Sequence, residues 1–410
     1  MTQQHNTTPE ISVRFNDLGV LPQLLKALET LRLTVPTPIQ RQSIPVALEG
    51  KDIVGIAQTG TGKTLAFGIP MIQRLGKIGG RGLVIAPTRE LALQIDETFR
   101  NIGRTVGLRT AVLIGGASLH LQRQMLAKKP HVVIATPGRL IDHLHQRNIV
   151  LSDTRILVLD EADRMFDMGF APQINEILKS VPTKRQTMLF SATMPQAILD
   201  IASRNMALPV RIEIAPSGTS PTLVEQEIWI VKKEAKQSLL QKMLSEHHGA
   251  VLVFSRTKYG ARKICVLVRG MGHTVSEIHS ERSLGQRREA LAGFKSGRYR
   301  VLVATDIAAR GIDVQGIELV VNYDLPDEAE NYVHRIGRTG RAGVTGKAIS
   351  FAMPDQGNEV RAIERLVRKT LEVKTHEGAQ LQAHGRIKSF APRHGGFGKQ
   401  SGFFGHRRRR

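Results

Sequence analysis

The sequence predicts an α/β protein of two tandem domains, each a mostly parallel sheet flanked by helices, followed by a disordered basic tail. Two observations predict this fold class. Short apolar runs alternate with helical patterns in both halves of the chain, and a run of turn-forming residues separates the halves. With 410 residues, of which 41% are hydrophobic and 23% charged, the chain is long enough for two globular domains of ordinary composition.

The first predicted domain covers residues 13–213 and follows a polar lead-in over residues 1–12 that we expect to be disordered. Its apolar runs have the length of buried parallel strands, which favours βαβ units. The strand candidates are 52–57, 82–86, 131–135, 156–159 and 187–190. Residues 214–221 form the predicted interdomain linker, because this segment consists largely of Pro, Gly, Ser and Thr without an apolar period.

The second predicted domain covers residues 222–375 and repeats the alternation. Its strand candidates are 227–231, 250–254, 300–304 and 319–322. Residues 376–410 form the predicted tail. Between Gly385 and Arg410 there are eight Lys or Arg, four Phe, many Gly and no acid, and such a segment cannot bury enough apolar surface to fold.

The net charge of +22, from 58 basic and 36 acidic residues, indicates a polyanionic partner. Nucleic acid is favoured over a membrane surface because no amphipathic basic helix stands out. The tail accounts for eight of these charges, so the remainder of the chain is basic as well. Arginine interspersed with Phe and Gly suits a tether for single-stranded nucleic acid, and an inert solvating tail is the alternative.

Several classes of protein are disfavoured by the composition. The single cysteine, Cys265, excludes a disulfide framework and a cysteine-rich zinc site, and its apolar neighbours predict a buried thiol. No apolar run reaches transmembrane length, and the polar N-terminus lacks the apolar region of a signal peptide. We therefore expect a cytoplasmic protein that does not associate with membranes.

The stretch Leu157–Asp163 runs from three apolar residues into Asp160, Glu161, Ala162 and Asp163. An apolar run that ends in acid predicts a buried strand that delivers carboxylates to the carboxyl edge of a sheet, where ligands bind in open α/β folds. The alternative is the polar start of a helix, where acids complement the helix dipole.

The segment Ala57–Thr64 lies between an apolar run and a helical pattern and reads Ala-Gln-Thr-Gly-Thr-Gly-Lys-Thr. Gly60 and Gly62 allow a tight loop whose backbone N–H groups surround phosphate oxygens at a helix N-terminus. Lys63 would reach the β- and γ-phosphates, and Thr64 would ligate Mg²⁺. Ala57 departs from the strict glycine spacing of such loops, and a turn rich in Gly and Thr is the alternative.

Together the two stretches predict phosphoryl transfer that requires ATP and Mg²⁺. Asp160 would hold the metal ion with Thr64, and Glu161 would orient or deprotonate an attacking water. Water attack is favoured over a kinase reaction, since a carboxylate beside the metal suits a water-positioning base.

The second half contributes an arginine-rich segment, His334–Arg341, at a predicted loop–helix junction. The second domain has no phosphate loop of its own, so these arginines are predicted to act as arginine fingers across a cleft. A solvated basic surface or a nucleic-acid patch is the alternative.

From Phe15 to about Leu371 the ordered series of motifs resembles the DEAD-box ATP-dependent RNA helicases of superfamily 2, which have two RecA-like domains. The resemblance implies roles for single residues. The residues implied to bind the nucleotide are Phe15, Gln40, Gln58, Thr59, Gly60, Thr61, Gly62, Lys63, Thr64 and Asp313. The residues implied to be catalytic are Lys63, Asp160, Glu161, Arg338 and Arg341. Those implied to couple hydrolysis to RNA binding are Asp163, Ser191, Thr193 and His334.

The resemblance further implies contacts to the RNA backbone from both domains. The residues at the matching positions are Pro87, Thr88, Arg89, Gly116, Thr136, Pro137, Arg139, Arg256, Arg287, Thr305 and Arg310. In the first domain these residues follow apolar runs, so they share the predicted carboxyl edge with the phosphate loop. Hydroxyls, backbone N–H groups and guanidinium groups there suit phosphate and sugar contacts, which do not read base sequence.

Three positions depart from the family pattern. Leu33 stands where an aromatic residue stacks on adenine, which leaves the preference for ATP over other nucleotides open. Leu284 replaces a glutamine and Ser280 a glycine, although Arg287 keeps its place. The amino-acid sequence of Asp163–Phe170 resembles that of the bacterial RhlE-like branch of the family.

Three function classes follow from the sequence. The first is an RNA-stimulated ATPase that unwinds short duplexes or remodels ribonucleoprotein. The second is an ATP-dependent RNA clamp or chaperone with little unwinding, and the third is a DNA-directed motor. The intact hydrolytic set favours the first. We expect a monomer that binds single-stranded and short duplex RNA, with partners in ribosome assembly or RNA decay.

Overall fold

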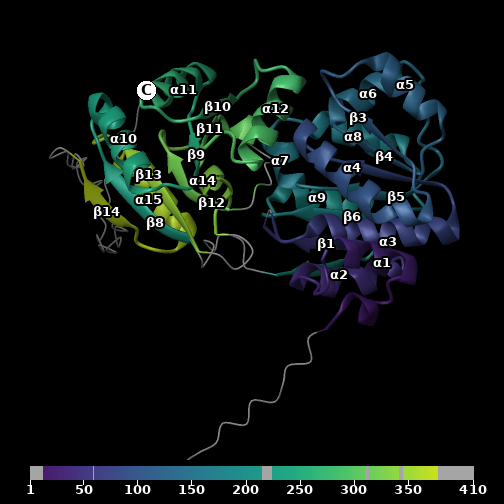
Figure 1. Ribbon diagram of the computed structural model, residues 1–410. Helices are drawn as coiled ribbons and strands as arrows, with labels where there is room; N and C mark the ends of the chain where they lie inside the picture. Colours follow the sequence, from purple (N-terminus) through teal and green to yellow (C-terminus); the bar gives the residue numbers. More distant parts are fainter. Residues whose placement is uncertain are drawn as a thin grey trace, which may run out of the picture.

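The computed structural model describes residues 13–58, 60–214, 224–309, 314, 316–340 and 345–376. The predicted lead-in, residues 215–221 of the predicted linker and residues 377–410 of the tail lie outside this part of the chain, as do Thr59, Arg310, Asp313 and Arg341. Within the described residues the chain forms two seven-stranded parallel sheets flanked by helices, which confirms the predicted fold class (Figure 1).

The first sheet has the strand order β3-β4-β2-β5-β6-β1-β7. All six of its strand pairs are parallel. Its strands are β1 (Ile53–Ile56), β2 (Arg81–Ile85), β3 (Thr110–Leu113), β4 (Val132–Ala135), β5 (Thr154–Leu159), β6 (Gln186–Ser191) and β7 (Val210–Glu213). Every strand candidate of the first domain coincides with one of these strands. The two strands that were not anticipated, β3 and β7, form the edges of the sheet, where one-sided pairing needs a weaker apolar run.

Helices cover both faces of this sheet. They are α1 (Pro22–Thr30), α2 (Pro38–Leu48), α3 (Lys63–Ile78), α4 (Arg89–Gly103), α5 (Leu119–Ala127), α6 (Pro137–His145), α7 (Ala162–Asp167), α8 (Ala171–Ser180) and α9 (Gln196–Asn205), with short 3₁₀ turns at Phe15–Leu18 and Arg104–Val106. Alternate strand residues enter two separate cores, one beneath α1–α4 and the other beneath α6–α9. Burial on both faces explains the continuous apolar runs of the sequence.

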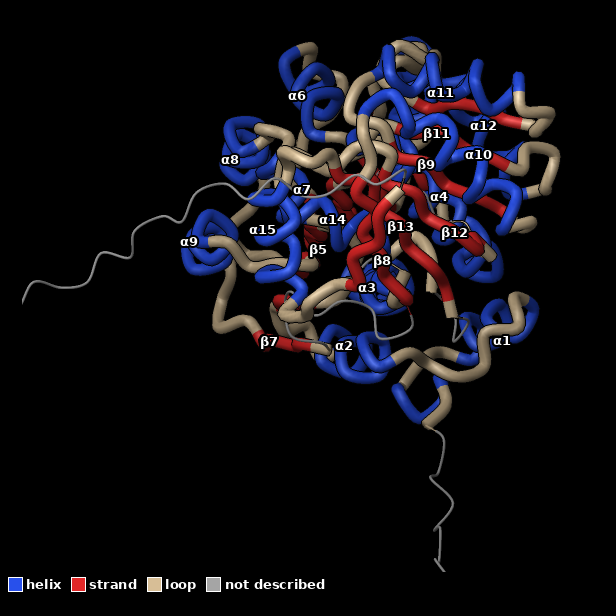
Figure 2. The backbone as a smooth tube through the Cα atoms, turned by 90° about the vertical axis from the view of Figure 1, so that its left-hand side faces the viewer, coloured by secondary structure: helices blue, strands red, loops and turns tan. Residues whose placement is uncertain are grey.

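The second sheet has the order β10-β11-β9-β12-β13-β8-β14. Its strands are β8 (Val224–Ile230), β9 (Ala250–Phe254), β10 (Val275–Ile278), β11 (Val301–Ala304), β12 (Ile317–Asn322), β13 (Gly346–Ala352) and β14 (Glu372–Thr375). Its helices are α10 (Lys236–Glu246), α11 (Lys258–Gly270), α12 (Leu284–Lys295), α13 (Asp306–Ala309), α14 (Ala329–Ile336) and α15 (Gly357–Val367), with a 3₁₀ turn at Lys233–Ala235. Helices again enclose the strands (Figure 2).

The two sheets have the same strand order. When the strands of the second sheet are counted from β8, the order is the same as in the first sheet. The helix that follows the first strand begins with a lysine in both, Lys63 at the start of α3 and Lys236 at the start of α10. In the second domain the Lys236 ammonium contacts Asp324, just beyond β12, at 2.9 Å and donates to the Tyr323 carbonyl at 2.7 Å.

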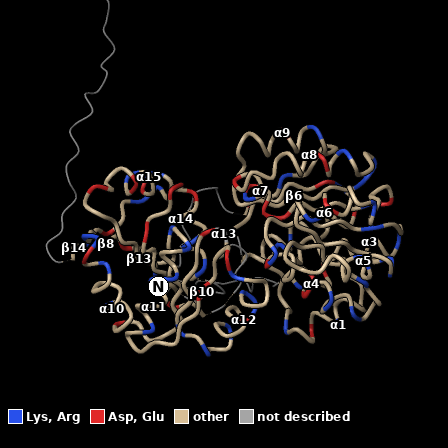
Figure 3. The backbone as a smooth tube through the Cα atoms, turned by 90° about the horizontal axis from the view of Figure 1, so that it is seen from above, with Lys and Arg blue, Asp and Glu red and all other residues tan. Residues whose placement is uncertain are grey.

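Three smaller observations complete the fold. Cys265 is a buried free thiol, as predicted. Among the described helices, none combines the length and the apolar character needed to cross a bilayer. Lys and Arg are interspersed with Asp and Glu along both domains (Figure 3).

Candidate nucleotide and nucleic-acid site

The loop between β1 and α3 has the backbone that a phosphate-binding turn needs. Gly60 and Gly62 have φ angles of 87° and 89°, a left-handed conformation that favours glycine. A Cβ atom on Gly62 would lie only 2.3 Å from Nε2 of Gln40, so a larger residue does not fit there. The predicted loop residues Gln58, Gly60, Thr61 and Gly62 therefore lie together at the N-terminus of α3, where backbone N–H groups attract anions.

Lys63 is only 6% exposed, and its ammonium group donates a hydrogen bond to the Ala57 carbonyl at 3.0 Å. The lysine thus folds back over the loop instead of extending into solvent. Ala57, which departs from the glycine pattern, serves as its acceptor through the backbone, and its side chain is 3% exposed within the first core. Thr64 follows as the second residue of α3 and is partly buried.

Gln40 connects the loop to the preceding helix. Its side-chain Oε1 accepts a hydrogen bond from the Thr37 amide at 2.9 Å, which closes a capping box at the start of α2. Its Nε2 donates to the Gly62 carbonyl at 3.0 Å. Leu33, in the loop before α2, is 39% exposed, whereas Phe15 is 3% exposed inside the hydrophobic core. The structure therefore brings Gln40 to the loop and places Phe15 in the packing beneath it.

The acidic residues after β5 are almost completely buried. Asp160, Glu161 and Asp163 are 2%, 2% and 3% exposed. Burial raises the pKa of Asp160 to about 7, although the Lys63 charge acts in the opposite direction. A buried carboxyl with a raised pKa beside a lysine and a phosphate loop is typical of a functional site. The alternative, the polar start of a helix, also describes part of this segment, because Glu161 is the N-cap of α7 and Asp163 lies in its first turn.

Glu161 occupies an unusual backbone position. It is the N-cap of α7 and has φ 52° and ψ 53°, the left-handed region that non-glycine residues rarely adopt. Such strain persists only where the surroundings impose it, and it is concentrated at functional sites. Its carboxylate lies 3.5 Å from Nε of Arg164, one turn along the helix.

Asp163 links the acidic segment to β6 through a dense set of hydrogen bonds. Its Oδ2 accepts three of them, from the Ala192 amide at 3.0 Å, the Thr193 amide at 2.9 Å and the Thr193 hydroxyl at 3.1 Å. The Asp163 amide donates to the Ser191 hydroxyl at 3.1 Å. Three of the four residues predicted to couple the two activities are therefore in direct contact.

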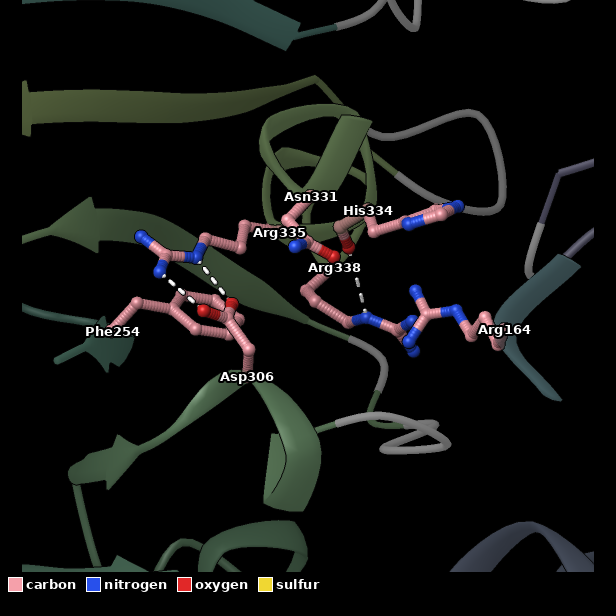
Figure 4. A pocket seen from close by; sticks show the side chains of 7 residues that line it. All are labelled: Arg164, Phe254, Asp306, Asn331, His334, Arg335 and Arg338. Atoms are coloured by element: carbon pink, nitrogen blue, oxygen red, sulfur yellow. Dashed lines mark hydrogen bonds and ion pairs between the residues drawn. The ribbon is translucent and has the colours of Figure 1, made fainter. Parts of the chain in front are cut away.

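The fourth, His334, lies on α14 of the second domain and lines a small interdomain cavity together with Arg164 (Figure 4). Arg338 lines the same cavity, is 2% exposed, and its Nε donates to the His334 carbonyl at 3.2 Å. Arg335 lies between them in sequence and was not singled out as a site residue. Its Nε and Nη2 donate to the two carboxylate oxygens of Asp306 at 2.5 and 2.6 Å, and its guanidinium group lies over the Phe254 ring. The motif that contains these residues could have pointed to it.

A cavity of about 350 Å³ lies at the carboxyl edge of the first sheet. Its lining includes six of the residues implied to contact RNA, namely Pro87, Thr88, Arg89, Thr136, Arg139 and Arg287. Thr88 caps α4 by accepting a hydrogen bond from the Leu91 amide at 3.2 Å. Arg139 donates to the Ala117 carbonyl at 3.0 Å. The same cavity is lined by residues that the sequence did not single out for this role, including Glu90, Met168, Phe170 and Ser280.

The remaining implied RNA contacts are more dispersed. Gly116 adjoins this region, since a Cβ on it would lie 2.3 Å from Nη1 of Arg89, and Pro137 is the first residue of α6. Thr305 follows β11, and Arg256 follows β9, at the carboxyl edge of the second sheet. Arg256 is engaged within its own domain by Asp327 at 3.1 Å and by the Leu325 carbonyl at 3.2 Å.

Comparison with known proteins identifies the family. Residues 37–201 match the DEAD/DEAH box helicase model and residues 235–343 match the helicase conserved C-terminal domain. The chain belongs to the DEAD-box family of ATP-dependent RNA helicases.

Its relatives include proteins named ATP-dependent rRNA helicase RRP3. The one from Debaryomyces hansenii is 43% identical over 341 residues, which cover 82% of this chain and 72% of the relative. The one from Yarrowia lipolytica is 45% identical over 342 residues, which cover 82% and 71%.

Two solved structures have a similar fold. S. cerevisiae Dbp5 bound to RNA and ADP BeF3 is 30% identical, with a TM-score of 0.79 over 88% of this chain and 95% of that one. The DEAD-box helicase Mss116 bound to ssRNA and UDP-BeF is 28% identical, with a TM-score of 0.83 over 91% and 82%.

Proposed function

We propose that this chain hydrolyses ATP in an RNA-stimulated manner and uses the cycle to separate short RNA duplexes or to remodel ribonucleoprotein. The observation that carries the proposal is a chain of contacts from the phosphate loop to the second domain. The Lys63 charge acts on Asp160, Arg164 pairs with Glu161, and Arg164 lines one cavity with Arg338. Each domain supplies a part that the other lacks, so the complete hydrolytic set exists only when the domains are together.

The donor atoms at the phosphate loop fit a magnesium ion. Asp160 offers a buried carboxylate and Thr64 a hydroxyl, both hard oxygen ligands of the kind that Mg²⁺ prefers. These two residues would hold the ion, which would supply neutralisation of phosphate charge. A cation there also favours the ionised form of Asp160, whose pKa burial raises.

The chain's own residues divide the remaining work. Lys63 exchanges its bond to the Ala57 carbonyl for the terminal phosphates of ATP, and Glu161 orients the attacking water or accepts its proton. Arg338 and Arg341 stabilise the charge on the transferred group from the second domain. Arg341, like the ribose-binding Asp313 and the RNA-binding Arg310, is proposed from the sequence alone.

The RNA strand is proposed to follow the 350 Å³ cavity at the carboxyl edges, held through its phosphates and sugars. Arg89 and Arg139 supply positive charge there, and Phe170 offers a ring on which a base can stack. The Asp163 hydrogen bonds to Thr193 would link the state of the nucleotide to this strand. The relatives named rRNA helicases support ribosomal RNA as the substrate and ribosome assembly as the process.

The arrangement of the two domains supports a state that is close to the nucleotide- and RNA-bound one. The chain matches the Dbp5 complex with a TM-score of 0.79, against 0.54 for a DEAD box protein from Methanococcus jannaschii that is 35% identical over a similar span. The lower score at higher identity indicates a different relative placement of the domains. We also propose that the protein acts as a monomer in the cytoplasm, where a buried thiol such as Cys265 stays reduced.

The proposal is tested by measuring the ATPase rate with RNA, with DNA of matched sequence and with neither, alongside displacement of a strand from a short RNA duplex. We expect stimulation by RNA and not by DNA, together with strand displacement that requires ATP. Equal stimulation by DNA would instead indicate a DNA-directed motor. ATP-dependent RNA binding without displacement would indicate a clamp.

A further inference from the structure

Arg164 is a buried arginine for which neither the phosphate loop nor the core packing accounts. It follows Asp163 directly on α7 and is 2% exposed, which makes it one of the largest fully buried side chains of the protein. A guanidinium group is rarely buried, because its removal from water must be compensated by charged or hydrogen-bonding partners. The contacts of Arg164 therefore indicate what it is for.

Its ion-pair partner is Glu161, the proposed base. Nε of Arg164 lies 3.5 Å from Oε2 of Glu161, and the two side chains are 2% and 3% exposed. This separation exceeds a normal hydrogen bond, so the attraction is mainly Coulombic and does not occupy a carboxylate lone pair. In a buried setting such an attraction is screened little and restricts where the carboxylate can lie.

The second domain lies on the other side of Arg164. Its guanidinium lines a cavity of only about 10 Å³ with Asn331, His334 and Arg338. Figure 4 shows the Arg164 side chain extending from the first domain toward Arg338. The cavity is about the size of one water molecule, so a change in the position of α14 would be transmitted to Arg164.

The charged partners of Arg164, Arg335 and Arg338 differ. Arg335 is neutralised by Asp306 at 2.5 and 2.6 Å. Arg164 and Arg338 face each other (Figure 4), and Arg164 also lies 3.5 Å from the Glu161 carboxylate of its own domain. Both arginine side chains line the same cavity, so a terminal phosphate that approached Arg338 would reduce the repulsion between the two charges. Arg164 is instead paired with Glu161.

We propose that Arg164 is a positioning residue for hydrolysis, which holds the Glu161 carboxylate toward the attacking water while α14 packs against its outer side. It would make the orientation of the base depend on the approach of the second domain. This inference rests on the proposed function, in which Glu161 is the base.

Three variants test the inference in the full-length protein. Arg164→Met keeps the volume and removes the charge, and Arg164→Lys keeps the charge. Arg185→Met is a matched control, because Arg185 is a partly buried arginine of the first domain that donates to the Pro182 carbonyl, away from the site. The measurements are kcat and KM for ATP at saturating RNA, binding of ADP-beryllium fluoride with RNA, and the melting temperature.

For Arg164→Met we expect kcat to fall by about 100-fold, the loss typical of a misplaced reacting group, with an unchanged KM for ATP. Arg164→Lys should recover part of the rate, and Arg185→Met should leave kcat unchanged. If Arg164 served only to stabilise the fold, Arg164→Met would lower the melting temperature without a selective fall in kcat at unchanged KM. An unchanged kcat in Arg164→Met would overturn the inference, as would equal losses in the Met and Lys variants.

Glu161→Gln distinguishes two statements, that Glu161 is the base and that Arg164 positions it. If hydrolysis survives this substitution, the assignment of the base is wrong. If hydrolysis collapses, the residual ATPase rate of the Glu161→Gln, Arg164→Met double variant is compared with that of Glu161→Gln alone. We expect no further loss in the double variant, because no carboxylate remains to be held. A further loss equal to that of Arg164→Met alone would show that Arg164 acts independently of Glu161.

Discussion

Arg287 of the second domain and Glu90 of the first form a buried ion pair, in which Nε lies 2.8 Å from Oε1 and the side chains are 9% and 4% exposed. Burial lowers the pKa of Arg287, and Glu90 opposes that shift. The pair stands at the wall of the cavity in which we place the RNA. It therefore connects the position of α12 to that of α4.

Truncation of either partner should weaken the association of the domains. Replacement of Arg287 by alanine leaves a buried carboxylate unpaired, a loss of about 2–5 kcal/mol for such pairs. We expect Arg287→Ala and Glu90→Ala to require more RNA for half-maximal ATPase stimulation, and the reversed pair to recover part of it. Additive effects of the two single changes in a double-mutant cycle would contradict this coupling.

Asp163 should transmit the hydrolytic state to the RNA site. Ser191→Ala together with Thr193→Ala removes both hydroxyl contacts to this residue but leaves two backbone amides on its carboxylate. We expect the double variant to retain RNA-stimulated ATP hydrolysis and to lose most duplex separation. Parallel measurement of both rates checks this, and an equal loss in both would assign the hydroxyl groups to folding or to catalysis.

Asp160 should give the nucleotide-free protein a characteristic dependence on pH. Its pKa is raised from 3.8 to about 7, so the folded state binds the proton more tightly than the unfolded state. Its contribution to stability is therefore fully present below about pH 4 and is lost as the pH rises through 7. Asp160→Asn should remove that slope from denaturant unfolding measured between pH 4 and 8 without Mg²⁺ or ATP, and an unchanged slope would contradict the assignment.

The tail should act through charge. Deletion of residues 385–410 removes eight Lys or Arg and no acid. For single-stranded nucleic acid, the salt slope of binding falls by about 0.7 for every phosphate that the protein no longer neutralises. We expect weaker RNA affinity and a flatter salt dependence, with ATP hydrolysis at saturating RNA nearly unchanged. An unaltered slope in an RNA-binding titration would leave the tail as a solvating segment.

Leu33 should set how strictly the protein prefers ATP. It is 39% exposed beside the helix that carries Gln40, so a ring in its place would be accessible to the base. Stacking of a base on an aromatic side chain is worth about 1–3 kcal/mol. We expect Leu33→Phe to lower the KM for ATP more than the KM for UTP. The same KM change for both nucleotides would argue against stacking.

The sequence predicted the parts of the site that are local. The loop before Lys63 and the carboxylates after β5 are read from a few adjacent residues, and their burial matches the expectation. Contacts of long side chains were not accessible in the same way. Arg164 was not singled out from the sequence, because its contact with the second domain involves Arg338, 174 positions later. Glu90 likewise acquires its role only when Arg287 reaches it.

Two further differences have physical causes. Phe15 is counted by the family pattern among the nucleotide contacts, yet the structure packs it in the core beneath α1 and α2. Phe15 shares this core with Ile39 and Ile44 of α2, the helix that carries Gln40. Five of the described strands were not among the candidates. Four of them, β3, β7, β10 and β14, are edge strands with a partner on one side only, whereas β13 lies between β12 and β8.

The shared strand order of the two sheets carries a consequence for stoichiometry. At the position of Lys63 the second domain has Lys236, and at the end of the strand that corresponds to β5 it has Asp324. There the two charges satisfy each other directly at 2.9 Å, in the place where a nucleotide would separate them. In the first domain the Lys63 ammonium instead donates to the Ala57 carbonyl at 3.0 Å. We therefore expect one ATP site per chain, in the first domain.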